Sequence, residues 1–366
     1  MAKSSMSHRQ RVKLAIEHKI TDRVPMDFAC EPEIWNKLQK HFGTDDKFAI
    51  LHKLDIDCRI VSYDFEVFCR PPGQEVRFGL STWRKETPDG VRIDIWGANR
   101  RYVQNEFASY EELCDYPLAD AKSVEDLKRY NWAQPDWWDF SELENVIEKI
   151  NPDGRYHVRY RIGSIFETAW SLCGIDKMLM NLALNPEIPG YIMDRINEVH
   201  IENLKRVMET AGDKIDMVYS YDDLAGQQTL LMSPEMWKSI VRPRQKKLFD
   251  VAKSFNKLIM YHCCGNISRL IDDLIDIGVD VLNPIQPLAL EMDFEELKKT
   301  FGLRLTFHGG IDIQELLPHG TAEQVSEEVE RAKRILGENG GYILSPAHHI
   351  QADTPIENIL ALYGLN

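Results

Sequence analysis

The sequence predicts an α/β protein folded as a (β/α)8 TIM barrel. Short apolar runs rich in β-branched residues alternate with amphipathic helical segments, as expected for a parallel sheet covered by helices. The strand-like runs number eight, which is the number that closes this kind of barrel. A doubly wound open sheet is the structural rival, but the GxGxxG turn expected after its first strand is absent from the sequence.

The eight predicted strands are spread along the whole chain. They cover residues 24–28, 58–63, 157–163, 217–223, 258–264, 281–285, 305–310 and 341–347. A length of 366 residues suits either one large barrel or two ordinary domains. Because no Ser/Gly-rich linker divides the chain, we expect a single domain over residues 1–366.

Helix signals lie between the later strands. Thr321 and Gln324 form a capping box, and we expect Gly337 to end that helix in a left-handed conformation. Asp293 is placed to cap a second helix, and Ser233 followed by Pro234 is typical of the start of a third. The alternation continues to the last predicted strand, which favours the barrel over two separate domains.

Residues 64–156 fit the alternation less well and are predicted to be an insertion in the barrel. Residues 79–97 alternate polar and apolar side chains around the turn Pro88-Asp89-Gly90, which is typical of a β-hairpin. Residues 132–140 are rich in Trp and are predicted to be a packed cap or loop.

Composition excludes several classes of protein. The formal net charge of −14 argues against binding to nucleic acid or to an anionic membrane as the main activity. The sequence has no apolar run long enough to span a membrane and no signal-like opening stretch, so a cytoplasmic protein is expected. The seven cysteines are then expected to be reduced thiols.

Polar side chains gather at the predicted carboxyl ends of the strands, where barrel enzymes carry their working residues. In chain order they are Asp27 and Cys30, Tyr63 and Asp64, Glu167, Asp222 and Asp223, His262 to Cys264, Asn283 and Gln286, His308, and His348 and His349.

The most specific element is His262-Cys263-Cys264. On an extended strand His262 and Cys264 point to the same side, whereas Cys263 points to the other. Imidazole and thiolate are good zinc ligands, and a catalytic zinc usually has three protein ligands and one open position. His348 is a candidate for the third ligand. The competing candidates are Asp222, Asp223, Glu167 and His308.

These residues also have simpler alternative roles. Cys264 and its neighbours can be a buried thiol beside a hydrogen-bonded histidine. Asp222 and Asp223 can cap the next helix or pair with Arg242 or Arg244. Glu167 stands near an expected helix start, where an acidic residue is favoured without any function.

Several motifs together resemble the uroporphyrinogen decarboxylase superfamily, whose members are (β/α)8 barrels. They are His262-Cys263-Cys264-Gly265-Asn266 with the following LIDDLIDIGVDVLNP, Gly309-Gly310-Ile311-Asp312, Gly320-Thr321, Gly341-Tyr342-Ile343, Asp353-Thr354-Pro355-Ile356-Glu357-Asn358, Asp22-Arg23-Val24-Pro25, and Met232-Ser233-Pro234-Glu235-Met236-Trp237. The resemblance is strongest from about residue 217 to the end of the chain.

Two branches of this superfamily imply different reactions. True decarboxylases carry an Arg-Gln-Ala-Gly-Arg segment after the first strand, which binds the acidic arms of a tetrapyrrole. Here residues 26–31 read Met-Asp-Phe-Ala-Cys-Glu, without an arginine, so a polyacidic substrate would be repelled.

The other branch, the zinc-dependent corrinoid methyltransferases, carries His-x-Cys after the fifth strand and Cys in the last loop. His262 and Cys264 match this pattern, and His348 stands where that branch has Cys. A histidine at this position also occurs in the decarboxylases. With one thiolate fewer, the metal would be a stronger Lewis acid.

The resemblance therefore implies a methyltransferase with Zn²⁺ held by His262, Cys264 and His348. The methyl group would pass between a small-molecule substrate and a corrinoid (cobalamin) carried by a separate protein. Glu167, Asp222 and Asp223 would orient substrate or relay a proton, and His308 would act as an acid/base or supporting residue. A decarboxylase or lyase acting on a smaller acid and a non-catalytic ligand-binding barrel are the alternatives. The oligomeric state stays open, with a homodimer among the options.

Overall fold

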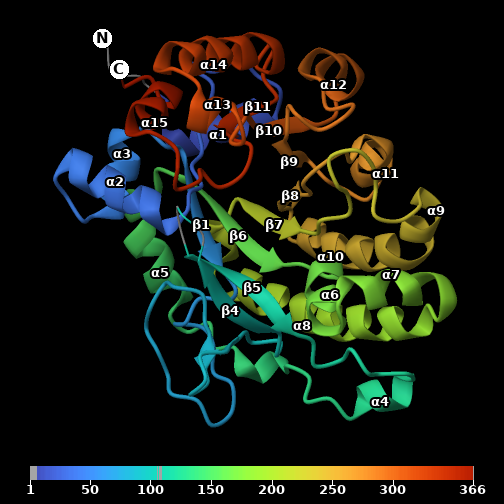
Figure 1. Ribbon diagram of the computed structural model, residues 1–366. Helices are drawn as coiled ribbons and strands as arrows, with labels where there is room; N and C mark the ends of the chain where they lie inside the picture. The colour runs from blue at the N-terminus through green and yellow to red at the C-terminus, as the bar shows by residue number, and fades with distance from the viewer. Residues whose placement is uncertain (1–5, 105, 107–108, 366) are drawn as a thin grey trace.

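A computed structural model describes residues 6–104, 106 and 109–365. Its centre is a curled sheet of seven parallel strands in the order β1-β6-β7-β8-β9-β10-β11, surrounded by helices (Figure 1). The strands are β1 (Cys58–Ser62), β6 (His157–Gly163), β7 (Met217–Tyr221), β8 (Leu258–His262), β9 (Val281–Ile285), β10 (Thr306–Ile311) and β11 (Tyr342–Pro346). Each matches one of the predicted strands.

The predicted strand at 24–28 is the exception, so the closed eight-stranded barrel is not confirmed. In this segment Met26 forms one isolated parallel bridge with Leu344 of β11. The Met26 carbonyl also accepts a hydrogen bond from the Asp57 backbone N–H, next to β1. The segment therefore lies between the two edge strands. Pro25 has no N–H to donate, which prevents a regular ladder at this position.

The helices alternate with the strands along most of the chain. They are α1 (His8–Ile16), α2 (Pro32–Phe42), α3 (Lys47–Lys53), α4 (Val124–Lys128), α5 (Leu143–Ile150), α6 (Phe166–Cys173), α7 (Ile175–Leu184), α8 (Glu187–Ala211), α9 (Pro234–Met236), α10 (Arg242–Ser254), α11 (Ile271–Asp276), α12 (Phe294–Phe301), α13 (Leu316–His319), α14 (Ala322–Leu336) and α15 (Ile356–Leu362). Among the described residues, none of these helices is long and apolar enough to cross a membrane.

The predicted helix starts are confirmed. Thr321 and Gln324 form the capping box of α14, Asp293 caps α12, and Ser233 caps α9. The prediction for Gly337 is wrong, because its φ of −81° is right-handed. The chain turns through left-handed glycines only later, at Gly340 and Gly341.

The insertion contains the predicted hairpin within a larger antiparallel sheet. Strands β2 (Lys85–Glu86) and β3 (Arg92–Ile93) form the hairpin, and β4 (Asn99–Gln104) and β5 (Ser109–Asp115) extend the sheet in the order β2-β3-β4-β5. In Figure 1, β4 and β5 lie beside α6. Trp138, from the predicted cap, is fully buried and donates a hydrogen bond to the Tyr63 carbonyl.

The amino-terminal end of the curled sheet is sealed by α1. Val12 and Ile16 of this helix pack against an apolar layer formed by side chains of several strands, among them Met217, Met260 and Ile343. This burial stabilises the closed end, since apolar area removed from water contributes about 25 cal/mol per Å². The polar side chains described below lie nearer the carboxyl ends of the same strands.

Candidate metal centre

The structure brings the three predicted metal ligands together. Donor atoms of His262, Cys264 and His348 all lie within 4.8 Å of one another. His262 is the last residue of β8, Cys264 follows two residues later, and His348 comes two residues after the end of β11. Residues separated by 84 positions in the sequence therefore meet at the carboxyl end of the sheet, where a parallel α/β sheet carries its sites.

The loop that carries Cys264 depends on the glycine after it. Gly265 has a φ of +83°, and a Cβ atom built there would lie 2.3 Å from the Gly226 carbonyl oxygen. A larger residue would therefore collide with the backbone of another loop. The Cys263 thiol instead accepts a hydrogen bond from the Leu224 backbone N–H inside the core, as the strand alternation predicts.

The spacing of these donor atoms fits a tetrahedral metal ion. The Cys264 Sγ lies 3.4 Å from the His262 Nε2. Two ligands at about 2.0–2.3 Å from a tetrahedral zinc lie about 3.3–3.8 Å apart. The rings of His262 and His348 are 5.7 Å apart between centroids and inclined at 64°. One nitrogen of each ring and the thiol sulfur can therefore face a shared centre.

The protonation of these groups also suits a cation. Burial lowers the pKa of His262 and, together with the neighbouring histidines, lowers that of His348 to about 4, so both rings are neutral at neutral pH. Burial, then Asp223 and Glu167, raise the pKa of the Cys264 thiol. A bound Zn²⁺ would stabilise the thiolate that this environment otherwise disfavours.

A chain of hydrogen bonds runs from His262 into the sheet. The His262 Nδ1 lies 2.6 Å from the Asn283 Oδ1, and the Asn283 Nδ2 lies 2.7 Å from the His308 Nδ1. The His308 Nε2 lies 2.9 Å from the Asp27 carboxylate, which forms an ion pair with Arg159. His308 is therefore not placed as a metal ligand, because both of its ring nitrogens already have partners.

Asp223 and Glu167 lie close to the ligands without joining them. The Asp223 carboxylate accepts a hydrogen bond of 2.8 Å from the Cys264 backbone N–H and lies 3.8 Å from the His262 Nε2. Burial, then Asp223 and Asp222, raise the pKa of Glu167 to about 8. Glu167 therefore keeps its proton at neutral pH.

Asp222 is fully buried and holds the start of α6. One of its carboxylate oxygens accepts hydrogen bonds from the backbone N–H groups of Ile165, Phe166 and Glu167, and the other accepts one from Gln245. Burial raises its pKa to about 7. The predicted alternative, a cap on the next helix, is wrong about the helix, because α6 precedes Asp222 in the chain.

The other predicted role of Asp222 and Asp223 was to pair with Arg242 or Arg244. This prediction is wrong, because both arginines lie near other carboxylates. Arg242 lies 3.9 Å from the Asp273 carboxylate, and Arg244 binds the Asp194 carboxylate at 2.7 Å.

Glu167 lines a small polar cavity of about 60 Å³ between the central sheet and the insertion. Tyr221 lines it at the end of β7, and Arg84 and Arg100 line it from the inserted sheet. Arg100 donates to Asp94 at 2.6 Å. A protonated carboxyl group therefore shares this cavity with hydroxyl and guanidinium donors. The cavity lies at the end of the sheet that carries the metal ligands.

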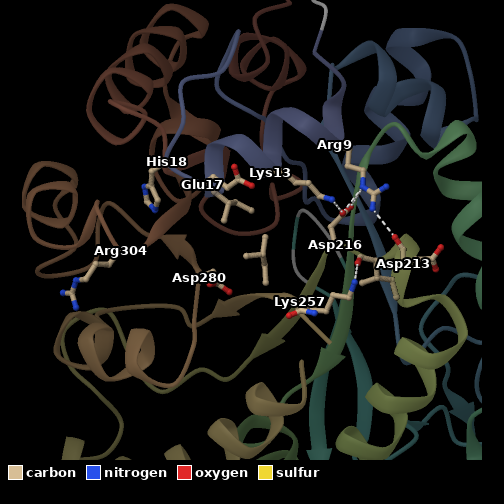
Figure 2. Close-up of a pocket in the computed structure, with 13 residues that line it drawn as sticks. Arg9, Lys13, Glu17, His18, Asp213, Asp216, Lys257, Asp280 and Arg304 are labelled. Atoms are coloured by element: carbon tan, nitrogen blue, oxygen red, sulfur yellow. Dashed lines mark hydrogen bonds and ion pairs between the residues drawn. The ribbon is translucent and has the colours of Figure 1, made fainter. Parts of the chain in front are cut away.

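A second hollow, of about 430 Å³, opens at the opposite end of the sheet (Figure 2). Its cations already have partners there: Arg9 and Lys13 each lie 2.8 Å from the Asp216 carboxylate, and Lys257 donates to two backbone carbonyls. It contains none of the predicted site residues. Its place at the amino ends of the strands argues against catalysis in this hollow, despite its larger volume.

Sequence reasoning recognised Asp27 and Asn283 only as strand-end residues and missed Arg159. The signal for Arg159 was available, because His157, Arg159 and Arg161 alternate along β6 and therefore share one face. A strand expected to be buried on both faces rarely carries three such residues on one of them.

Comparisons with known proteins give a family match to part of the chain and a solved structure with the same fold. The family model described as Uroporphyrinogen decarboxylase (URO-D) matches residues 116–365. A solved methyltransferase from Methanosarcina mazei superposes with a TM-score of 0.68 at 16% identity, covering 99% of this chain and 98% of its own. At that identity the match shows the fold.

Curated relatives match about half of this chain and about half of their own length. A methylcobamide:CoM methyltransferase MtaA of Methanosarcina barkeri is 28% identical over 170 residues, covering 46% of each chain. The methylcobamide:CoM methyltransferase MtbA of Methanosarcina acetivorans is 24% identical over 184 residues, or 50% of each chain. A methylated-thiol–coenzyme M methyltransferase of Methanosarcina mazei is 23% identical over 214 residues, covering 57% of this chain and 52% of its own.

Proposed function

Because the chain belongs to the uroporphyrinogen decarboxylase (URO-D) family, we propose that it is a zinc-dependent methyltransferase that works with a corrinoid. The observation that carries the proposal is the convergence of His262, Cys264 and His348 within 4.8 Å. The relatives named as methylcobamide:CoM methyltransferases support the reaction class.

In this proposal His262, Cys264 and His348 hold the zinc ion. When bound, zinc supplies a Lewis acid that lowers the pKa of a thiol or polarises a methylated heteroatom. Asp223 accepts the Cys264 backbone N–H and so holds the loop with the sulfur facing the two imidazoles. Its carboxylate near the ligands also adds negative charge that favours a cation.

Glu167 is proposed as the proton donor of the site. Since its pKa is raised to about 8, it carries a proton at neutral pH and can give it to a leaving heteroatom. The small polar cavity beside it is where we place part of the substrate. Asp222 and His308 are proposed to act through neighbours, because their polar atoms already bind Gln245 and α6 in one case and Asn283 and Asp27 in the other.

The methyl group would pass between a small substrate and a corrinoid presented by a separate protein.

The charges near the first predicted strand disfavour a polyacidic tetrapyrrole, the substrate of the decarboxylase branch. Asp27 is ion-paired with Arg159, and Glu31 is paired with His349 at 3.0 Å. Arg161, the arginine of β6 nearest the rim, is already bound to Asp64 at 2.9 Å. These pairs leave the first-strand segment without the free cations that a polyacid would require.

The direct test measures methyl transfer with free methylcobalamin. Zinc-loaded protein is mixed with methylcobalamin and coenzyme M or another thiol, and demethylation of the cobalt is followed by absorbance. We expect thiol-dependent demethylation that is lost on replacing Cys264 by Ser and kept on replacing Cys263 by Ser. The second variant is the matched control, because the Cys263 thiol faces the core.

Two outcomes would overturn the proposal in different ways. Release of carbon dioxide from a small acid without cobalamin would favour the decarboxylase alternative. Ligand binding with no turnover in either direction, using any thiol or methylated substrate in the panel, would favour a non-catalytic barrel.

A further inference from the structure

A chain of hydrogen-bonded side chains lies behind the metal ligands. It consists of Arg159, Asp27, His308, Asn283 and His262, which come from β6, the segment at 24–28, β10, β9 and β8. We name it the relay. We propose that the relay sets the tautomer and orientation of His262, with Asn283 as the positioning residue, so that the bare Nε2 faces the metal position. This inference rests on the metal site of the proposed function.

The donor and the acceptor of each hydrogen bond in the relay can be assigned by starting from the Asp27 carboxylate. The Asp27 carboxylate is held ionised by Arg159, so it can only accept. The His308 Nε2, 2.9 Å away, must therefore donate to it. In a neutral imidazole the other nitrogen is then an acceptor, and the His308 Nδ1 receives the Asn283 Nδ2–H at 2.7 Å.

The Asn283 amide in turn determines which ring nitrogen of His262 carries the proton. With its nitrogen directed at His308, Asn283 turns its Oδ1 toward the His262 Nδ1 at 2.6 Å. An amide oxygen accepts only, so the His262 Nδ1 carries the proton. A histidine that binds a metal must be neutral, and its Nε2 is then bare. That nitrogen lies 3.4 Å from the Cys264 sulfur, on the metal side.

The strand register makes this arrangement rigid. His262 and Asn283 are direct partners in the β8–β9 ladder, and the Cys263 N–H donates to the Asn283 carbonyl at 2.8 Å. Asn283 is 8% exposed and His308 is 3% exposed, so water has little access to compete for their polar atoms. The side-chain polar atoms of Asn283 and His308 all have partners, and buried polar groups satisfied in this way hold one geometry.

The test combines metal affinity with a direct measurement of the tautomer. Asn283→Leu removes the acceptor. Asn283→Asp keeps an oxygen facing the His262 Nδ1, and because a carboxylate cannot donate, His308 must then carry a proton on Nδ1 as well as on Nε2. We expect zinc affinity, measured by chelator competition, to fall about 10–100-fold in Asn283→Leu and to stay within a few-fold of wild type in Asn283→Asp.

Asn151→Leu is the matched control for general damage. Asn151 is also buried and exchanges two hydrogen bonds with the Tyr156 backbone, but it lies before β6, outside the metal centre. Its replacement is expected to lower stability and to leave zinc affinity unchanged.

Nitrogen-15 NMR of histidine-labelled, metal-free protein reads the tautomer itself. We expect His262 as the Nδ1–H form in wild type and Asn283→Asp, and as a mixture in Asn283→Leu. A single Nε2–H form in wild type, or an unchanged tautomer in Asn283→Leu, would overturn the inference even if zinc binds. Absence of zinc binding with the expected tautomer in place would instead overturn the metal site of the proposed function.

Discussion

At the scale of single residues, the sequence identified the metal ligands better than their supports. His262 and Cys264 share one side of a strand end, which their spacing predicts directly. His348 required the assumption that two distant strands end at one rim. Asn283 could not be assigned a role in advance, because that role depends on the pairing of β8 with β9 and on one amide's orientation.

Glu167 should make stability depend on pH. Its folded pKa of about 8 lies above the ordinary value of 4.5. Between these two pH values the folded protein keeps a proton that the unfolded chain releases. The stability that Glu167 contributes is fully present below pH 4.5 and is lost as the pH rises through about 8. In urea denaturation of metal-free protein, Glu167→Gln should therefore lose less stability than wild type between about pH 5 and pH 8. Equal losses in the two proteins would contradict the raised pKa.

Gly265 should be needed for metal binding although it offers no ligand. Replacing it by Ala would place a Cβ atom 2.3 Å from the Gly226 oxygen, at a φ of +83°. We expect the loop to shift and zinc affinity to fall at least tenfold. Gly90→Ala, at a φ of +80° with open space around it, is the matched control and should keep zinc affinity. Unchanged zinc affinity in Gly265→Ala would show that this loop tolerates the shift.

At the scale of elements, most helices and strands follow from local signals, and the exceptions have physical causes. The capping box of α14 and the Ser-Pro start of α9 were predicted from the sequence. The segment at 24–28 has a strand-like composition, but Pro25 and its place between two strand edges reduce it to one bridge. The inserted sheet was seen only as a hairpin, because the polar strands β4 and β5 give no apolar pattern.

The start of α6 depends on a carboxylate from the neighbouring strand end. Asp222 accepts three backbone N–H groups there, so Asp222→Ala should lower the free energy of unfolding by about 2–4 kcal/mol. Asp222→Asn keeps an oxygen acceptor and should cost less, with methyl transfer retained. Loss of transfer in a stably folded Asp222→Asn protein would instead make Asp222 a direct participant in the chemistry.

At the scale of the whole molecule, the two ends of the sheet have different roles. The amino end is closed by α1 over an apolar layer, and its hollow contains paired charges (Figure 2). The carboxyl end carries the metal ligands and the cavity at Glu167. The parallel α/β class was predictable from the alternation of elements. The number of regular strands was not, because closure depends on backbone hydrogen bonds between segments far apart in the chain.

This division predicts that changes at the amino end affect stability alone. Asp216 is buried and binds Arg9, Lys13 and the Val158 backbone N–H. Asp216→Ala should lower stability by about 2–4 kcal/mol, measured by urea denaturation, and leave zinc affinity unchanged. A parallel loss of zinc affinity in a folded variant would contradict the separation of the two ends.

The central claim is that His262, Cys264 and His348 hold a zinc ion, and elemental analysis of purified protein tests it most directly. Two adjacent cysteines provide the comparison: Cys264 faces the imidazoles, and Cys263 faces the core. We predict stoichiometric zinc in wild type and in Cys263→Ser, and little or none in Cys264→Ser and His262→Ala. Wild-type protein without zinc, or equal zinc in the two cysteine variants, would contradict the account.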